Sequence, residues 1–361
     1  MTKPVLYILT LSSLLLVASC QSVEQLSIDY LLPADVSFPQ QLKKVAIVNN
    51  VPADDSEPSV TKTETESEYI ETATFSGNPA ITAEALAQAL AEGNYFDEVV
   101  ICDSALQATG STAKQMLETE EANQLINDLQ VDFLIALEDI KIRTRRKISY
   151  VPGWNVYHGT VDAKVYPSIS VYLPNRKGPM VSINNNDSIF WEEFDNSGQR
   201  VMARLISQEE VIRQASDFGG SIPVKHLLPH WKTATRYLFT GGSVNMRDAA
   251  IYAKESNWPE AIKLWEQAYD SKKGKQKMYA ACNIALGYEM QDSIATATEW
   301  AKKAQEQARK IDKIDQQNSQ SVTPASVPNF VFTSLYVEEL QDRKNSQMKL
   351  SVQMQRLGDD F

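Results

Sequence analysis

Histidine and cysteine are scarce in this sequence, and their scarcity excludes several kinds of site. The 361 residues include 3 histidines and 3 cysteines, so a histidine-rich metal centre has too few ligands. His226 and His230 have the i, i+4 spacing that puts two imidazoles on one helical face. Pro229 lies between them, however, and would disturb such a helix. We therefore expect no metal ion and no other cofactor.

The sequence motifs of common catalytic sites are also missing. Gly-x-Ser-x-Gly, Gly-x-Gly-x-x-Gly, the phosphate loop and His-Glu-x-x-His do not occur. Glu192 and Glu193 follow Trp191, but adjacent residues of a strand point to opposite faces, so this pair cannot flank one glycosidic bond. The sequence therefore favours a protein without enzymatic activity.

Basic residues are outnumbered. Lys and Arg total 35 against 46 Asp and Glu, which gives a formal net charge of −11. Nucleic-acid binding needs a basic surface, so no nucleic acid is expected as a partner. The same balance argues against adhesion of the whole chain to anionic lipid.

The N-terminus has the organisation of a secretory signal. Lys3 precedes an apolar stretch from Val5 to Val17, which is shorter than the ~20 residues that span a bilayer. Val17-Ala18-Ser19-Cys20 resembles the lipobox of bacterial lipoproteins. The resemblance implies cleavage of residues 1–19 and lipid on Cys20, where more than one acyl chain gives stable membrane anchoring. An ordinary secretory signal that contains a cysteine is the alternative.

The other two cysteines and the residue after Cys20 carry less information. Gln21, rather than Asp, follows Cys20, and by resemblance to sorted lipoproteins this favours the outer membrane, facing the periplasm. Exposure on the cell surface stays open. Cys102 and Cys282 lie in apolar surroundings that suit buried thiols, and we expect no disulfide between them because they fall in different predicted domains.

Residues 43–198 are predicted to form an α/β domain after a tether at 20–42. Apolar runs at 44–49, 99–102 and 132–137 alternate with helical patterns at 82–93 and 114–129. The acidic, Ser- and Thr-rich stretch 54–71 is typical of a solvated loop.

Longer strands with period-two patterning follow. Residues 140–150, 161–171 and 180–192 alternate apolar and polar side chains, as antiparallel strands buried on one face do. One polar face forms a basic strip of Lys141, Arg143, Arg145 and Lys147. It is either a solvated face or protected sheet edge, or a docking strip for an acidic protein or for lipopolysaccharide phosphates.

The order of these elements resembles a known periplasmic module. Lys44-Val-Ala-Ile-Val48, the helix at Ile81–Leu86 and the strand Val131-Asp-Phe-Leu-Ile135 are similar to the α/β module of curli-secretion-channel lipoproteins. The resemblance is one of element order, and the membrane-inserting hairpins of that family have no counterpart here.

Residues 199–242 are predicted to be connecting helices. Ser207-Gln208-Glu209-Glu210 is typical of a capping box, and the helix it starts should end near Phe218. A second helix is predicted over Pro229–Phe239, with Trp231, Thr235 and Leu238 on one face.

A repeat with a period of 36 residues occupies 243–310. Ala249, Tyr252, Ala261, Trp265 and Ala268 recur as Ala285, Tyr288, Ala297, Ala301 and Ala304. The pattern resembles the tetratricopeptide repeat, in which small residues lie where helices cross. A pair of ordinary helical hairpins is the alternative. The helix near Trp231 and a C-terminal helix at 333–361 are predicted to cover the two ends of the repeats, with a flexible loop at 311–332.

The whole layout resembles a family of Gram-negative lipoproteins that carry a domain of unknown function. The residues that carry this resemblance are Pro229-His230-Trp231, Arg236-Tyr237-Leu238-Phe239 and the stretch from Asn257 to Trp265. The family implies no particular activity.

These observations predict an α+β protein: an N-terminal mixed α/β sandwich followed by an all-α repeat domain. We expect a non-enzymatic scaffold or adaptor in the cell envelope, with protein partners and with membrane attachment through Cys20. By analogy with tetratricopeptide grooves, the partner-binding residues would be Met246, Ala250, Tyr279, Leu286 and Glu289. The alternative is a small-ligand receptor or enzyme with a site between the domains, near Trp154, Tyr157 and Trp191.

Overall fold

The computed structural model describes residues 22–52, 58–65, 68–106, 116–316 and 323–357. The chain divides into two compact units, and it passes between them three times. The sheet unit consists of Pro33–His230 and Ser351–Phe361, and the helical unit of Met1–Leu32 and Trp231–Leu350. The predicted signal segment 1–19 and Cys20 lie outside the described residues.

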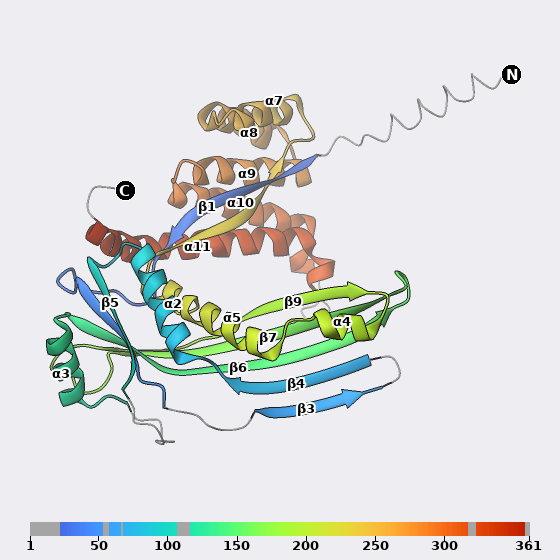
Figure 1. The fold of residues 1–361 in the computed structure, drawn as a ribbon. Helices are drawn as coiled ribbons and strands as arrows, with labels where there is room; N and C mark the ends of the chain where they lie inside the picture. Colours follow the sequence, from blue (N-terminus) through green and yellow to red (C-terminus); the bar gives the residue numbers. More distant parts are fainter. Residues whose placement is uncertain (1–21, 53–57, 66–67, 107–115, 317–322, 358–361) are drawn as a thin grey trace. The chain divides into compact units, whose positions relative to one another are not determined.

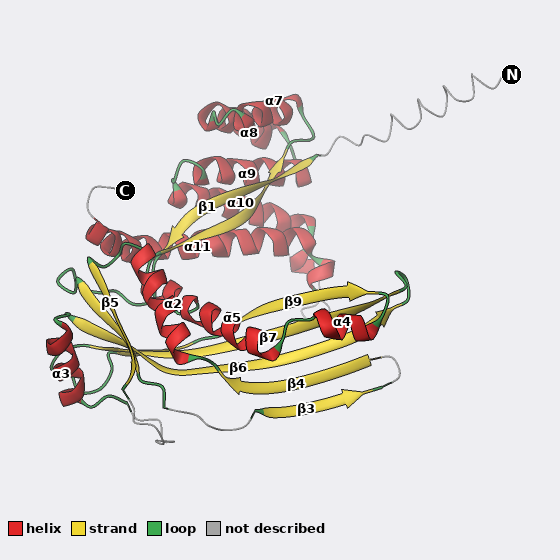
Figure 2. Cartoon of the chain, viewed as in Figure 1, coloured by secondary structure: helices red, strands yellow, loops and turns green. Residues whose placement is uncertain are grey.

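A mixed sheet forms the centre of the sheet unit (Figures 1 and 2). β2 pairs in parallel with β5 and β6, and every other printed pairing in this sheet is antiparallel. β6 is the central strand, since β2 and β4 pair along one of its edges and β7 along the other. The strands are β2 (Lys44–Asn49), β3 (Ser59–Glu64), β4 (Glu68–Ser76), β5 (Glu98–Ala105), β6 (Phe133–Val151), β7 (Val156–Tyr172), β8 (Val181–Asn184) and β9 (Asp187–Asp195).

Helices cover this sheet because its strands are apolar on both sides near β2. Leu86 and Leu90 of α2 (Pro79–Glu92) pack on Ile47 and its neighbours, whereas Ile126 of α3 (Thr119–Leu129) packs on the cluster that contains Val48. Neighbouring strand residues point to opposite faces, so α2 and α3 lie on opposite sides. The remaining helices of this unit are α4 (Gly198–Arg204), α5 (Gln208–Ser221) and α6 (Val224–Leu227). The forward half of the predicted capping box starts α5: the Ser207 side chain accepts a hydrogen bond from the Glu210 N–H. The Glu210 carboxylate accepts from Arg213 and Gln214 instead of reaching back to Ser207.

The prediction of a solvated loop at 54–71 is wrong for the part that the structure describes. β3 and β4 form an antiparallel hairpin there, with Ser59 opposite Thr74 and Glu64 opposite Tyr69. β3 is exposed along its length, so polar Thr, Lys and Glu side chains suit it. Its composition is that of a loop because both of its faces contact solvent, and not because it lacks regular structure.

The tether predicted at 20–42 is also wrong from Val23 onwards. β1 (Val23–Leu32) forms a two-stranded ribbon with β10 (His230–Phe239). The carbonyl of Ser22 accepts hydrogen bonds from the N–H groups near the end of β10, at Thr240 and Gly241. Residues that follow β1 are packed as well, and Phe38 stacks among the rings of Phe96 and Phe133.

β10 replaces the helix predicted over Pro229–Phe239. Its buried side chains are Ala234, Arg236, Leu238 and Phe239, and the first three alternate with exposed residues as in a strand. Trp231 is 66% exposed and covers no end of the repeats. The helical unit is therefore not all-α, because it contains the β1–β10 ribbon, which we call the ribbon.

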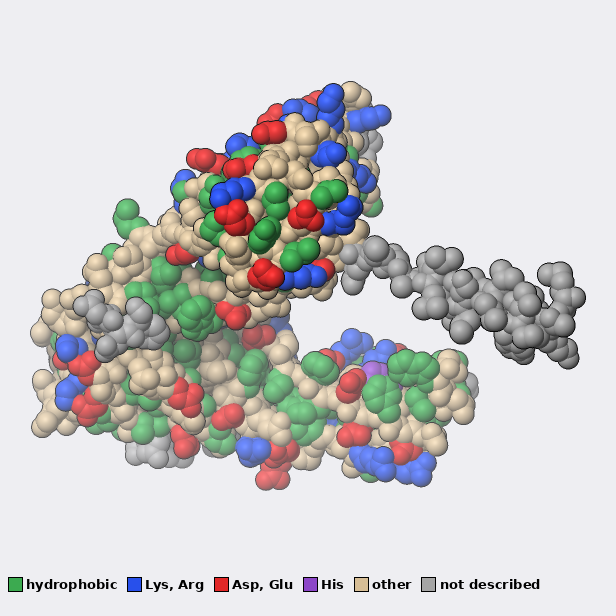
Figure 3. All heavy atoms as spheres, turned by 90° about the horizontal axis from the view of Figure 1, so that it is seen from above, with side chains coloured by type: hydrophobic (Ala, Val, Ile, Leu, Met, Phe, Trp, Pro, Cys, Tyr) green, Lys and Arg blue, Asp and Glu red, His purple; other side chains and the backbone are tan. Residues whose placement is uncertain are grey.

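The helices of the repeat lie where the 36-residue period predicts them. They are α7 (Val244–Lys254), α8 (Trp258–Ser271), α9 (Gly274–Glu289) and α10 (Ile294–Ile311). The recurring alanines Ala249, Ala285, Ala261 and Ala297 are all fully buried. Hydrophobic side chains lie between charged ones on the face of this unit that Figure 3 shows.

A long C-terminal helix, α11 (Pro328–Met354), covers one end of the repeat helices, as predicted. Tyr336, Val337 and Leu340 pack against α9 and α10 in one buried cluster. The helix begins inside the stretch 311–332 that was predicted to be a loop. No helix within the described ranges is both long enough and apolar enough to cross a bilayer. The α+β prediction is confirmed.

Candidate functional site

The surface predicted to be a partner groove is occupied by the chain itself. Tyr279 of α9 stacks on Phe239 of β10, with ring centroids 4.0 Å apart and an interplanar angle of 13°. Met246 and Ala250 are buried in the same apolar cluster as Phe239. Leu286 and Glu289 are buried too, so this predicted set is wrong as an open binding surface because the ribbon already covers it.

The side chain of Asn283 in α9 binds the backbone of β10. Its side-chain oxygen accepts the N–H of Phe239 at 2.9 Å, and its side-chain nitrogen donates to the carbonyl of Phe239 at 2.8 Å. Both bonds are buried, and Asn283 is fully buried. One amide therefore satisfies both polar groups of a strand residue that has no second strand on that side.

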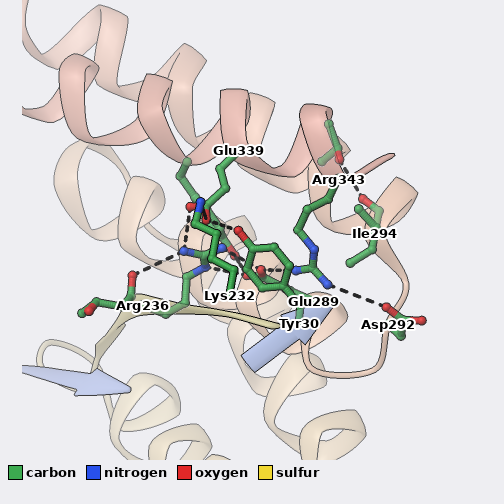
Figure 4. A network of polar contacts seen from close by, with 11 residues as sticks. Tyr30, Lys232, Arg236, Glu289, Asp292, Ile294, Glu339 and Arg343 are labelled. Carbon is green, nitrogen blue, oxygen red and sulfur yellow. Dashed lines mark hydrogen bonds and ion pairs between the residues drawn. The ribbon is translucent and has the colours of Figure 1, made fainter. Parts of the chain in front are cut away.

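A network of buried charges joins β10 to α9 and α11 (Figure 4). The Arg236 guanidinium donates to both carboxylate oxygens of Glu289, at 2.9 and 2.8 Å. Burial opposes the charge of Arg236, but its hydrogen bonds to Glu289 raise the pKa of Arg236 above its usual range. A bidentate pair of this kind fixes geometry as well as charge.

Two side chains of α11 complete the surroundings of Glu289. The Tyr336 hydroxyl donates to Glu289 at 2.7 Å, and Arg343 donates to it at 2.6 Å. Burial and then the Glu289 charge raise the pKa of Tyr336 well above its ordinary value, so this phenol stays protonated. Glu289 thus accepts from three donor side chains, and its buried charge is fully compensated.

Glu339 is the second carboxylate of the network. It accepts from Arg236 at 2.9 Å and from the hydroxyl of Tyr30 in β1, and Lys232 of β10 lies 3.1 Å away. Burial favours its neutral form, but the Tyr30 hydrogen bond and the Arg236 charge outweigh burial and lower the pKa of Glu339 to about 2. Arg343 also lies over the Tyr30 ring, 4.0 Å from its centroid. The network therefore connects both strands of the ribbon to α11.

A pocket opens beside this network. Its volume is about 170 Å³, and its lining comes from β10, α9 and α11. Tyr237 and Leu335 are 38% and 60% exposed, whereas Arg236 is buried. The lining residues are Thr235, Arg236, Tyr237, Cys282, Leu286, Phe332, Leu335, Tyr336 and Glu339. The pocket is mainly apolar, with one compensated pair of charges in its wall.

The polar groups of the pocket do not suit catalysis by a thiol or a free base. Burial raises the pKa of the Cys282 thiol to about 12, so the reactive thiolate is scarce at neutral pH. Arg236 and Glu339 are committed to each other and to further partners. What this geometry can do is accept an apolar group and orient it against Tyr237 and Phe332, whose rings contact each other edge to face.

A family model described as Domain of unknown function (DUF8603) matches residues 42–239, which is more than half of the 361-residue chain. The protein belongs to this DUF8603 family. A second model, Domain of unknown function (DUF6340), matches residues 247–342. The comparison with curated proteins gives no match. The DUF8603 match ends at the last residue of β10, and the DUF6340 match contains α9 and the first part of α11, up to residue 342.

The predicted basic strip of this DUF8603-family protein lies on a polar face of the sheet unit. Ile140, Ile142 and Ile148 are buried, and the alternate side chains of β6 point to the other face, as predicted. β6 pairs on both edges, so the strip is not a protected sheet edge. Lys147 pairs with Glu68 at 2.5 Å, and Arg143 lies over the Tyr166 ring. Lys141 and Arg145 are exposed.

Aromatic residues that the sequence analysis missed extend this face. Phe190 and Phe194 of β9 are 63% and 40% exposed. In the β6–β7–β9 register, Phe190 is aligned with Arg145, and His158 stacks on Phe194. The spacing of two phenylalanines four apart, on the polar face of a strand, was the sequence signal for this patch.

The aromatic residues of the predicted ligand site do not converge. Trp154 is 69% exposed, in the turn between β6 and β7. Tyr157 and Trp191 instead pack on the core beneath α4 and α5, and the Trp191 ring N–H donates to Gln214 at 3.0 Å. All three belong to the sheet unit.

The described residues contain no group of three or more His, Cys, Asp or Glu side chains that could hold a metal ion. His226 lies beside Asp35, and the ring of His230 contacts the carbonyl of Leu228. The two histidines that are four apart in sequence therefore have separate partners. Cys102 and Cys282 are free thiols in different units.

Proposed function

We propose that this protein is a lipid-anchored, non-enzymatic scaffold of the bacterial cell envelope, which binds a protein partner through its helical unit. Lipid on Cys20 would hold it at the outer membrane, facing the periplasm. The support for the anchor is the lipobox-like Val17-Ala18-Ser19-Cys20. The support for partner binding is the pocket between β10 and α11.

The size of the pocket is the observation that carries this proposal. Sites for small molecules and cofactors usually have volumes of about 300–1,000 Å³. A volume of about 170 Å³ suits a single apolar side chain from a partner better than it suits a whole metabolite. The exposed Leu335 and Tyr237 at the pocket extend the apolar contact on to the surface. An anchor side chain in a pocket with apolar neighbours is the usual core of a protein interface.

The occupied groove moves the expected contact from the inner helices to α11. Tetratricopeptide-like helices commonly bind extended or helical segments, and here the ribbon fills that role from within the chain. A partner would therefore contact the outer side of β10 and α11, near Thr235, Tyr237 and Leu335. The small residues at the helix crossings support the tetratricopeptide resemblance, which remains part of the proposal.

The sheet unit would supply a second contact. The basic strip exposes Lys141 and Arg145 towards an acidic partner. The exposed Phe190, which is aligned with Arg145 across the intervening Asp162, adds apolar area. Acidic and aromatic residues on that partner would match this face. The contact would depend on salt, because exposed charges are screened.

The anchor is tested by labelling growing cells with a palmitate analogue. Wild-type protein should carry the label and enter the detergent phase, and Cys20→Ala should carry none. Retention of residues 1–19 on the purified wild-type protein would contradict the anchor.

The partner contact is tested by site-specific photo-crosslinking in cells. A photoreactive residue at Leu335 should give a discrete adduct with an envelope protein. The matched control is Met348, which lies on the same helix and is 80% exposed. Equal adducts at both positions, or none at Leu335, would count against the pocket as the binding site.

A further inference from the structure

The first described residue lies close to a lysine-rich segment of the helical unit. Ser22 accepts the N–H groups of Thr240 and Gly241 through its carbonyl. The next residue, Gly242, has φ of +113°, and a Cβ there would lie 2.0 Å from Oε1 of Gln276. Gln276 belongs to the lysine-rich segment Lys272–Lys277, which consists of the two-residue link between α8 and α9 and the first turn of α9. Ser22 and this segment therefore flank the same Gly241-Gly242 turn.

The segment carries a local excess of positive charge in an acidic protein. Lys272, Lys273, Lys275 and Lys277 lie within six residues, and none is fully buried. Among the described residues, no ion pair neutralises them, and Lys277 only rests over the Tyr269 ring at 4.2 Å. Arg247 is exposed and donates to the Gly242 carbonyl at 3.0 Å. The nearby acids on the same segments are Asp248 and Asp270, both exposed.

Covalent geometry then fixes how far this surface can be from the proposed anchor. Only Gln21 separates Cys20 from Ser22, and consecutive Cα atoms are about 3.8 Å apart. The Cα of Cys20 therefore lies within about 8 Å of the Cα of Ser22. The Debye length at physiological salt is also about 8 Å, so Ser22 is held within the range of the potential of the bilayer that holds the lipid. The lysines on the other side of the Gly241-Gly242 turn are therefore held on the part of the helical unit that adjoins the anchor.

We infer that the lysine surface, formed by Arg247, Lys272, Lys273, Lys275 and Lys277, docks on the phosphate groups of anionic phospholipids next to the anchor. The inference rests on the proposed lipid on Cys20. It refines the argument from net charge, because the charge of −11 belongs to the whole chain and a bilayer responds to the nearest surface. The exposed Val244 beside Gly242 adds an apolar group to the same surface.

The test is lysine acetylation of the lipidated protein in vesicles, read by mass spectrometry. In vesicles that contain phosphatidylglycerol, the four lysines of this surface should react about fivefold more slowly than in neutral phosphatidylcholine vesicles, the factor expected for ~1 kcal/mol per lysine. The difference should disappear in about 1 M salt, where the Debye length is about 3 Å. Equal reaction in both kinds of vesicle would overturn the inference.

Lys344 is the internal control of this experiment. It is exposed and follows Arg343, which contacts Tyr30 at the far end of β1. A strand rises about 3.3 Å per residue, so Tyr30 lies roughly 26 Å from Ser22. Lys344 should therefore react equally in both kinds of vesicle, and protection of Lys344 to the same extent would show non-specific adsorption and overturn the inference.

A second measurement separates this surface from the anchor itself. The unlipidated chain from Gln21 to Phe361 is mixed with phosphatidylglycerol vesicles at low salt, and bound protein is measured by sedimentation. One variant replaces the four lysines of the lysine surface: Lys272→Gln, Lys273→Gln, Lys275→Gln, Lys277→Gln. Its apparent affinity for the vesicles should be at least tenfold lower than that of the wild type. The matched control removes four charges from the basic strip: Lys141→Gln, Arg143→Gln, Arg145→Gln, Lys147→Gln.

The outcomes distinguish the two ideas. If palmitate labelling fails but only the lysine-surface variant loses vesicle binding, the proposed lipid anchor is wrong and the inference about the lysine surface is supported. If labelling succeeds but only the strip variant loses binding, the anchor stands and the lysine surface is wrong.

Discussion

The side-chain amide of Asn283 is hydrogen-bonded to both backbone polar groups of Phe239, so that α9 holds β10 as a groove holds an extended peptide. The Tyr279 ring stacked on Phe239 adds an apolar contact on the same residue. The repeat helices of this protein therefore have an internal ligand, the ribbon. Their inner surface contributes to stability, so the proposed partner would bind to other faces.

Asn283→Ala should destabilise the helical unit by about 3 kcal/mol, because it leaves a buried N–H and a buried C=O of Phe239 without partners. Thermal unfolding should begin at a lower temperature, and the backbone N–H groups of β10 should exchange with solvent faster. Asn245→Ala is the control, since it removes only a surface bond to Gln267 and should change stability by less than about 0.5 kcal/mol. Equal stability of the two variants would refute the role given to Asn283.

Glu289→Gln should cost about 3–5 kcal/mol, because it leaves the buried Arg236 and the mostly buried Arg343 without their shared carboxylate. Denaturant unfolding measures this loss. Glu306→Gln breaks an exposed pair with Lys310 and should have little effect, since such pairs are screened. A Glu289→Gln protein as stable as the wild type would mean that solvent reaches Arg236.

The network should make stability depend on pH in the acid range. The pKa of Glu339 is lowered from 4.5 to about 2, so its charged form stabilises the fold. This contribution is complete above the unfolded value, near pH 4.5, and is lost as the pH falls towards about 2. The difference in unfolding free energy between wild type and Glu339→Gln should therefore shrink over this interval. If this difference in unfolding free energy stays constant between about pH 6 and about pH 2, Glu339 is not the source of the pH dependence.

The two free thiols should react at very different rates. The Cys282 thiol is fully buried with its pKa raised to about 12, whereas Cys102 is half-buried at the sheet edge strand β5. Iodoacetamide should modify Cys102 in the folded protein and Cys282 only when the helical unit opens. Peptide mass spectrometry across a denaturant series measures both, and rapid native modification of Cys282 would show that the pocket opens to reagents.

The sequence was sufficient where burial follows a simple period. β2 has the predicted bounds because five of its six residues are buried and four of those five are apolar. The 36-residue recurrence located the repeat helices because alanines such as Ala261 and Ala297 must lie at their crossings. The alternation along β6 likewise placed the basic strip on a polar face.

β10 was mistaken for a helix because its pattern fits two periods. Trp231, Thr235 and Leu238 have helical spacing, yet Trp231 and Thr235 are exposed. The buried residues include Ala234, Arg236 and Leu238, which have the period of a strand. A buried arginine is not an apolar signal, and its partner Glu289 lies 53 positions away. Only the fold shows that Arg236 belongs to an interior face.

The candidate site was unpredictable for the same reason. Tyr30, Arg236, Glu289 and Glu339 come from four elements spread over most of the chain. From the sequence alone, charged residues on α11 are typical of a solvated helix face. The groove residues were located correctly on the helices, but the sequence offered no sign that β10 covers them.

The ribbon has a consequence for how this polypeptide is made. Tyr30 and Glu339 are separated by 309 positions, and chain closure over such distances is slow because its entropy is paid before the contact forms. A chain delivered from its N-terminus, by the ribosome or through an export pore, presents β1 first and α11 last. β1 then stays an unpaired edge, open to wrong pairing, until nearly the whole molecule has followed. A holding chaperone that recognises extended segments would act most usefully on those first residues.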